Sequence, residues 1–289
     1  MVPDFHLHTH FSRHAKGDIS EYLAAAQNLG LTEVCFAEHV SREYLPQEVR
    51  DAIPYSWMEF GELPKYLSWL EQVRERSPLP LYKGLEADYI AGYEKTLGEY
   101  LASAESELDF VLGSIHFLQE YNFKYFSTMT PDFPPLEVML TYYARAKQAV
   151  ESGLFDSIAH LNLGWQAVPW PESQEEQRQA EEAIADVIQT AANQGVGIEV
   201  NTRAFNYEAY GTKERYDFFL GLIADCGAFI TLGSDAHCPE DVGRNYPTAI
   251  ATLQKFGIDE VAVFIKRERH MRPIKPLRPV NLGSIQQGA

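Results

Sequence analysis

The sequence predicts an α/β protein in which parallel strands form a TIM-like barrel surrounded by helices. Short apolar, β-rich runs alternate with longer amphipathic segments along the whole chain, and such alternation is typical of parallel βαβ units. Seven of these units in a chain of 289 residues fit a closed barrel better than an open sheet. Because the carboxyl ends of barrel strands converge on one face, we expect the functional residues there.

The individual elements follow from these runs in chain order. The short β-rich runs predict strands at residues 2–8, 33–39, 80–89, 108–116, 156–161, 196–201 and 228–235. The amphipathic segments predict helices near 18–29, 62–77, 93–106, 135–152, 173–194, 212–225 and 240–256. Two long irregular stretches, 40–60 and the aromatic, proline-rich 117–134, interrupt the alternation. Loops of this length are often lids or binding loops.

One barrel domain is predicted over residues 1–270, followed by a loosely packed tail over 271–289. The N-terminal MVPDFHLHTH lacks the basic start and apolar core of a signal peptide, and no apolar run is long enough to cross a bilayer. The three cysteines include no CxxC pair, which favours reduced thiols and a cytoplasmic location.

The net charge of −17 limits the partners that the chain is expected to bind. Such a surface repels phosphate backbones, which argues against a long nucleic-acid partner and against an anionic membrane. A small phosphorylated substrate is still compatible with this charge, since bound divalent cations can be the largest charges in a site. The sequence leaves the oligomeric state open.

Histidine is concentrated where the functional face of the barrel is expected. The stretch HLHTHFSRH, residues 6–14, holds four of the nine histidines. His6 and His8 lie two apart on a strand, so both side chains point to the same face. Further candidate ligands lie at or just past the ends of later strands, namely His39, Glu86, His116, His160, Asp235 and His237. Imidazoles and carboxylates without paired thiolates suit Zn, Mn or Fe.

With His14, nine candidate ligands are available, which suffice for two or three divalent ions with a carboxylate bridging between neighbours. Such clusters generate hydroxide at neutral pH and hold the oxygens of a phosphoryl group, so the sequence predicts phosphoester hydrolysis. Phosphate also needs fixed positive groups, which arginine supplies best. Arg203, after the sixth strand, is the first candidate and Arg244 the second, while Asn201 could orient a ligand or the phosphate.

Taken in order, these motifs resemble those of the PHP (polymerase and histidinol phosphatase) phosphoesterases, and within them the shorter histidinol-phosphatase branch. The matching stretches between Asp4 and about Pro247 are HLHTHFSRH, CFAEH, GLEADYIAGYEKTL, ELDFVLGSIHF, IAHLN, EVNTRAF and GSDAH. The resemblance implies a distorted (β/α)7 barrel with a trinuclear metal centre. It implies a first ion on His6, His8, Glu86 and Asp235, a second on Glu86, His116 and His160, and a third on His14, His39 and His237.

The resemblance also implies roles for individual residues. Glu86 would bridge the first two ions, and a hydroxide between these ions would attack phosphorus in line. Glu86, Asp235 and Arg203 are therefore the predicted catalytic residues, whereas His10 falls outside the family pattern and is expected to be structural. The main prediction is a metal-dependent phosphatase that hydrolyses L-histidinol phosphate in histidine biosynthesis.

The resemblance weakens just after His160. The branch usually continues with an acidic residue and then basic residues, whereas this chain reads HLNLGWQAVPW, with Asn162 and no Arg or Lys nearby. The departure leaves the metal chemistry intact but concerns the substrate, so a nucleotide or another small phosphoester is the alternative. A non-catalytic metal-binding accessory protein and a metal-dependent amidohydrolase are more distant alternatives.

Overall fold

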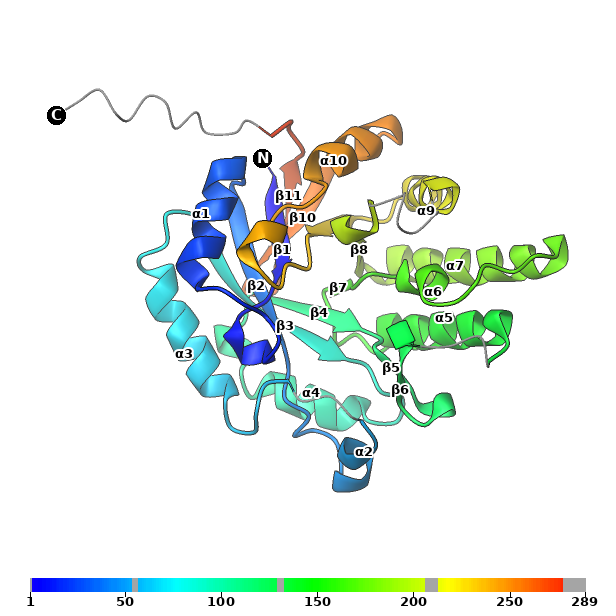
Figure 1. Ribbon diagram of the computed structural model, residues 1–289, viewed down its shortest axis with the longest axis horizontal. Coiled ribbons are helices and arrows are strands. Elements are labelled where there is room, and N and C mark those ends of the chain that lie inside the picture. The colour runs from blue at the N-terminus through cyan, green and yellow to red at the C-terminus, as the bar shows by residue number, and fades with distance from the viewer. Residues whose placement is uncertain (1, 54–56, 129–132, 206–212, 278–289) are drawn as a thin grey trace.

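The core of the protein is a seven-stranded parallel sheet that curls into a nearly closed barrel (Figure 1). The computed structural model describes residues 2–53, 57–128, 133–205 and 213–277. In sheet order the strands are β1 (Pro3–Leu7), β2 (Glu33–His39), β3 (Leu81–Asp88), β4 (Phe110–Ser114), β7 (Ser157–Ile158), β8 (Gly197–Asn201) and β9 (Ile230–Gly233). An isolated parallel bridge between Leu7 and Ala236 connects β1 to the segment that follows β9. The predicted fold class is therefore confirmed.

Helices surround the strands on the outside of the barrel (Figure 1). The longer ones are α1 (Ile19–Leu29), α3 (Leu63–Arg74), α4 (Glu94–Ala102), α5 (Pro135–Glu151), α7 (Gln174–Gln194), α9 (Lys213–Cys226) and α10 (Tyr246–Lys255), and the shorter ones α2 (Gln47–Ala52) and α6 (Leu163–Gln166). Local signals set their ends. Asp18 and Glu21 form a capping box at the start of α1, and Gly30 ends that helix in a left-handed conformation.

The strands bury side chains on both of their faces. On β2, Val34 and Phe36 belong to the large hydrophobic core between strands and helices, whereas Cys35 and Ala37 belong to a smaller cluster. The alternation follows from the two-residue period of a strand. In β1 the pairing register gains one residue between Asp4 and Leu7. His6 lies within this irregularity, and His8 follows directly after it.

An antiparallel hairpin that was not predicted closes the end of the barrel where the strands begin. It consists of β10 (Glu260–Ile265) and β11 (Glu268–Pro273). Ala262, Val263 and Phe264 complete the smaller hydrophobic cluster. Residues 271–273 thus belong to β11 and Ile274 is buried, while 278–289 lie outside the described residues. The predicted boundary between domain and tail stays a prediction.

Several predicted elements are shorter than expected, because the chain turns early near the functional face. The predicted strand 156–161 is reduced to Ser157–Ile158, and the predicted helix 240–256 begins only at Tyr246, after Asn245 adopts a left-handed conformation. The irregular stretch 117–134 contains a small hairpin of β5 (Phe117–Leu118) and β6 (Lys124–Tyr125).

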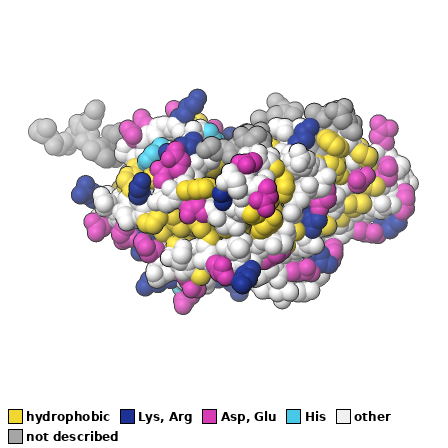
Figure 2. All heavy atoms as spheres, turned by 90° about the horizontal axis from the view of Figure 1, so that it is seen from below, with side chains coloured by type: hydrophobic (Ala, Val, Ile, Leu, Met, Phe, Trp, Pro, Cys, Tyr) yellow, Lys and Arg dark blue, Asp and Glu magenta, His cyan; other side chains and the backbone are white. Residues whose placement is uncertain are grey.

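The surface carries charges of both signs. Figure 2 shows acidic side chains spread over the visible face, with Lys and Arg among them. Within the described ranges, no helix has the length and apolarity needed to span a bilayer.

Candidate metal centre

The predicted ligands converge at the end of the barrel where the strands finish. Three groups each offer ligand atoms that lie within 4.8 Å of one another: His6, His8 and Asp235; His39, Glu86 and His116; and His8, His39 and His237. His160 joins them, since its Nε2 lies 3.0 Å from Oε1 of Glu86. The His14 ring stacks on that of His237 with centroids 4.5 Å apart. All nine predicted ligands are thus brought together.

Glu86 lies at the middle of this cluster. Its Oε1 is 3.4 Å from Nε2 of His116, and its Oε2 is 2.9 Å from Nδ1 of His39 and 3.4 Å from Nε2 of His6. Burial would raise the pKa of Glu86, but the facing imidazoles outweigh burial and hold that pKa well below its ordinary range. An ionised carboxylate at the centre of five imidazoles has the placement that a bridging ligand needs.

The facing of His6 and His8 is the clearest sign that a cation belongs here. Nδ1 of His6 lies 2.6 Å from Glu199, and Nδ1 of His8 lies 3.3 Å from Glu38. Both Nδ1 atoms are therefore placed to donate a hydrogen bond to a carboxylate. Both Nε2 atoms are then unprotonated, and their lone pairs face each other with the nitrogens only 3.1 Å apart. Two such lone pairs repel unless a proton or a metal ion lies between them.

The pairing of His39 with Glu86 supports a metal rather than a proton. Although His39 Nδ1 and Glu86 Oε2 are 2.9 Å apart, their geometry does not make a hydrogen bond, and within the described residues neither of these buried atoms has a hydrogen-bond partner. Atoms that are close together but do not point at each other are typical of ligands aimed at a common third atom. The donor set thus fits Zn, Mn or Fe.

A layer of buried carboxylates behind the ligands was missed by the sequence reasoning. Glu199, Glu38 and Asp88 hold Nδ1 of His6, His8 and His116 at 2.6, 3.3 and 2.9 Å. Such carboxylates fix the tautomer and orientation of metal-binding imidazoles. Their signal in the sequence is a charged residue inside or at the end of an apolar strand run, as in CFAEH, LEADY and GIEVN, because a buried charge must have a partner.

Two candidate ligands and one glycine have constrained backbone positions at this face. His160 and Asp235 adopt positive φ angles of 28° and 53°, which are uncommon for residues with a side chain and cluster at functional sites. The backbone N–H of His160 is held by Glu199 at 2.9 Å. A Cβ on Gly233 would lie within 2.5 Å of both His6 and Glu199, so GSDAH needs a glycine at its start.

Aromatic residues of the two long irregular stretches cover the ligands. Trp57 stacks on His39 with ring centroids 3.9 Å apart, and Tyr125 stacks on His116 at 5.7 Å. Arg42, which is buried, lies 4.4 Å above the Trp57 ring. These three residues were not singled out in the sequence. Their contacts agree with the expectation that stretches 40–60 and 117–134 form part of the site.

A cavity of about 390 Å³ opens beside the ligands His116, His160 and Asp235. Asn201 and Arg203 also line it, and Arg203 Nη1 lies 4.0 Å from Oδ2 of Asp235 with about half of its side chain exposed. These predicted substrate contacts are therefore beside the metal centre.

Arg244 and His10 lie outside this lining. The Arg244 guanidinium pairs with Asp241 at 2.6 Å and approaches the carbonyl oxygen of Asp235 at 3.5 Å. His10 instead meets the edge of Trp69, with ring centroids 5.0 Å apart. This aromatic contact fits the structural role that was expected of His10.

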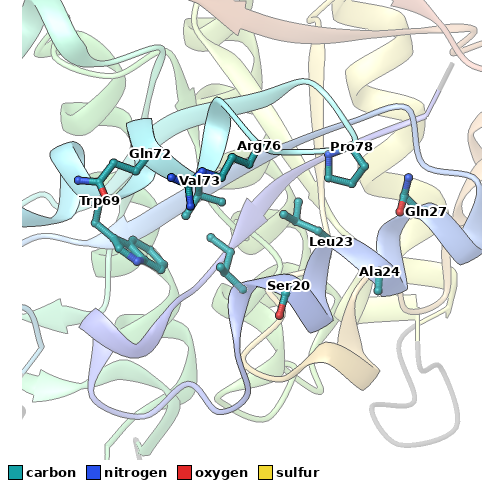
Figure 3. Close-up of a pocket in the computed structure, with 10 residues that line it drawn as sticks. Ser20, Leu23, Ala24, Gln27, Trp69, Gln72, Val73, Arg76 and Pro78 are labelled. Carbon is teal, nitrogen blue, oxygen red and sulfur yellow. The ribbon is translucent and has the colours of Figure 1, made fainter.

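A second hollow, of about 450 Å³, lies on the outside of the barrel between α1 and α3 (Figure 3). Apolar side chains such as Leu23 and Val73 face it, and its lining includes no histidine or carboxylate. Among the described residues, neither candidate ligands nor other carboxylates line this hollow, so the smaller cavity beside the histidines is the candidate substrate site.

The family follows from a comparison of the whole sequence. A PHP domain matches residues 4–203. The chain belongs to the PHP family. One of its relatives is a probable histidinol-phosphatase of Deinococcus radiodurans, 29% identical over 93% of this chain and 98% of its own length. A histidinol-phosphatase of Lactococcus lactis is 23% identical over 94% and 98% of the two chains.

A solved structure shows the same fold. It is the histidinol phosphate phosphatase of Lactococcus lactis in complex with zinc, L-histidinol and phosphate, and it matches with a TM-score of 0.73 at 22% sequence identity. The match covers 93% of this chain and 98% of that one. The PHP barrel predicted from the ordered motifs is thereby confirmed over nearly the full length.

Proposed function

We propose that this chain is a metal-dependent phosphomonoesterase that hydrolyses L-histidinol phosphate to L-histidinol and phosphate, a step of histidine biosynthesis. One observation carries the proposal: the nine candidate ligand side chains lie together beside a cavity that Arg203 also lines. The names of the relatives and the L-histidinol and phosphate in the Lactococcus lactis structure support the choice of substrate.

The proposed metal sites keep the sets implied by the family. The sets are His6, His8, Glu86 and Asp235; Glu86, His116 and His160; and His14, His39 and His237, for two to three Zn, Mn or Fe ions. His39 lies close to two other candidate ligands. Its Nδ1 is 2.9 Å from Oε2 of Glu86, and its ring centroid is 6.1 Å from that of His237. His39 is thus placed to connect the third set to the other two.

When bound, the ions would supply a nucleophile from water at neutral pH and neutralise the phosphate oxygens. The protein's own contribution is position and charge. Arg203 extends from the end of β8 over the cavity, where a guanidinium can form paired hydrogen bonds with phosphate. Asn201 Nδ2 lies 3.3 Å from Glu199 and 3.5 Å from Asp235, and its backbone carbonyl accepts from Tyr216. Asn201 can therefore keep Asp235 oriented.

The cavity favours a small substrate over a long one. A volume of about 390 Å³ is at the lower end of the range for small-molecule sites and leaves no room for several nucleotides. A nucleotide or another small phosphoester remains the second candidate, because Asn162 stands in the cavity wall where the family usually carries charged residues. The complete donor set argues against a non-catalytic role. The three cysteines form no disulfide, which fits the proposed cytoplasmic location.

The proposal is tested by phosphate release from L-histidinol phosphate, AMP and phenyl phosphate, with protein loaded with Mn or Zn. We expect kcat/KM for L-histidinol phosphate to exceed the other two values by about 1,000-fold, which corresponds to about 4 kcal/mol of differential binding. A flat or nucleotide-biased profile would keep the phosphoesterase and reject L-histidinol phosphate. Absence of turnover with all three esters in metal-loaded protein would reject the phosphatase.

A further inference from the structure

A pair of amide side chains forms one wall of the cavity, directly after the ligand His160. Asn162 is the N-cap residue just before the short helix α6, and its Nδ2 donates to Oε1 of Gln166 at 2.9 Å. Both residues line the cavity together with His160 and Tyr125. The pair therefore occupies the stretch in which this sequence departs most clearly from its family.

The pair leaves one hydrogen-bond acceptor and one donor unused. Oδ1 of Asn162 and Nε2 of Gln166 are buried and have no partner among the described residues, and Asn162 as a whole is 3% exposed. Turning both amides over reverses the bond between them but still leaves one oxygen and one NH2 group. A buried amide without partners is unfavourable. Because both residues line the cavity, we infer that their missing partner is a polar group of a molecule bound there.

The surroundings define which polar group fits. Among the described residues that line the cavity, Arg203 is the only Lys or Arg, and it lies near Asp235. The amide wall carries no charge, so it cannot neutralise a second phosphate or a carboxylate. It suits an alcohol part that is neutral or cationic and that carries both a donor and an acceptor.

We propose that Asn162 and Gln166 form the specificity wall that receives the alcohol part of the substrate and selects against a second anionic group. This inference rests on the proposed function. The L-histidinol part of L-histidinol phosphate has an ammonium group that can donate to the unused amide oxygen. Its imidazole has a ring nitrogen that can accept from the unused amide NH2. Tyr125, stacked on His116, provides an aromatic face beside them.

The test removes the hydrogen-bonding atoms while keeping side-chain volume, with Gln166→Met as the first variant and Asn162→Leu as the second. kcat/KM is measured with L-histidinol phosphate and with phenyl phosphate, whose alcohol part has no further polar group. We expect the ratio of the two values to fall at least tenfold in each variant, mainly through KM for L-histidinol phosphate. The inhibition constant of L-histidinol as a product should rise by a similar factor.

A matched control is available on α7, where Gln189 donates to Asn193 at 3.1 Å in an exposed amide pair of the same spacing. Gln189→Met should leave the substrate ratio unchanged. Because Asn162 is buried and its substitution can affect folding, metal content and thermal midpoint are measured for all variants, and Gln166→Met decides the question if Asn162→Leu does not fold.

The outcomes separate this inference from the proposed function. Equal losses with both esters, or no loss with either, in Gln166→Met would overturn the specificity wall while leaving the phosphatase intact. If the unaltered protein hydrolysed phenyl phosphate but not L-histidinol phosphate, the proposed substrate would be rejected. The specificity wall proposed for that substrate would then be rejected as well. A lowered ratio with an unchanged inhibition constant for L-histidinol would also contradict direct recognition of the alcohol part.

Discussion

The two ends of the barrel both bury carboxylates, but they supply them with different partners. At the end where the strands begin, Asp156 accepts from the backbone N–H of Val111 at 2.7 Å and pairs with Arg267 at 2.5 Å. Asp109 pairs with Arg74 at 3.2 Å in the same region. Asp156 and Asp109 therefore each have a permanently charged arginine partner from the chain itself.

At the opposite end the partners of the carboxylates are imidazoles. Among the described residues, the ion-pair partners of Glu86 are all histidines, and Arg203 approaches Asp235 only at 4.0 Å. Imidazoles can balance these charges only by taking up protons or by sharing a metal ion. This end is therefore electrostatically complete only with bound cations, whereas the other end is complete in the folded chain. Substitutions of the charged groups should therefore lower metal binding and activity at the end with the imidazoles, and the free energy of unfolding at the end with the arginines.

Glu86→Gln should give the largest effect on catalysis. The substitution removes the central negative charge, so we expect loss of bound metal and a fall in kcat/KM of at least about 1,000-fold, since metal-bound charge stabilisation is worth several kcal/mol. Metal analysis and phosphate release measure the two quantities. Full metal content with an unaltered rate would show that Glu86 is not the bridging ligand.

Glu199→Gln should weaken the centre without removing a ligand. An amide can offer its oxygen to the backbone N–H of His160 or to Nδ1 of His6, but not to both as Glu199 does. Loss of such a partner typically costs about 10–100-fold in metal affinity, which competition with a chelator measures. The control is Glu33→Gln, another buried carboxylate, which pairs with Arg272 where the strands begin. Equal metal affinities in the two variants would contradict the orienting role of Glu199.

The sequence allowed the grouping of the candidate ligands to be predicted, because these residues follow strand ends, and strand ends are visible as breaks in apolar runs. His39 and Glu86, for example, pair across β2 and β3 in the register that the predicted strands imply. The seven parallel strands were predictable for the same reason. The hairpin β10–β11 was not, because its function in the fold is to fill the barrel end, and that depends on contacts with distant strands rather than on local pattern.

The carboxylates behind the ligands were harder to predict than the ligands. Glu199 contacts His6 across 193 positions of the chain, and Glu38 contacts His8 across 30. No local pattern encodes such distances, and a glutamate within a strand is equally compatible with an exposed face. The positive φ of His160 and Asp235 also has no signal in the sequence, since it results from constraints that the folded barrel imposes.

Arg203→Ala should have a moderate effect that falls mainly on substrate binding. A charge-assisted hydrogen bond to phosphate from a half-exposed guanidinium is worth about 1.4 kcal/mol, so KM should rise about tenfold while kcat changes less. Steady-state kinetics with L-histidinol phosphate measure both. Arg178 on α7 is a matched control, because its side chain is 54% exposed against 53% for Arg203. An unchanged KM in Arg203→Ala would remove this residue from the phosphate site.

Arg267→Met should have the smallest effect on catalysis and the clearest effect on folding. Burial raises the pKa of Asp156, and Arg267 counteracts it by pairing with the ionised carboxylate. Without Arg267 the buried carboxylate is unpaired, so unfolding free energy at neutral pH should fall by about 2 kcal/mol, less than for a fully buried pair because Arg267 is partly exposed. The loss should shrink as the pH falls toward the raised pKa of Asp156, since protonation removes the unpaired charge and the folded state then binds the extra proton. Urea titrations across that pH range measure the loss of unfolding free energy.

The same substitution should leave kcat/KM within about twofold, because the two ends of the barrel are independent sites. A large loss of activity at full metal content would show that the two ends are coupled, and the contrast between them would fail.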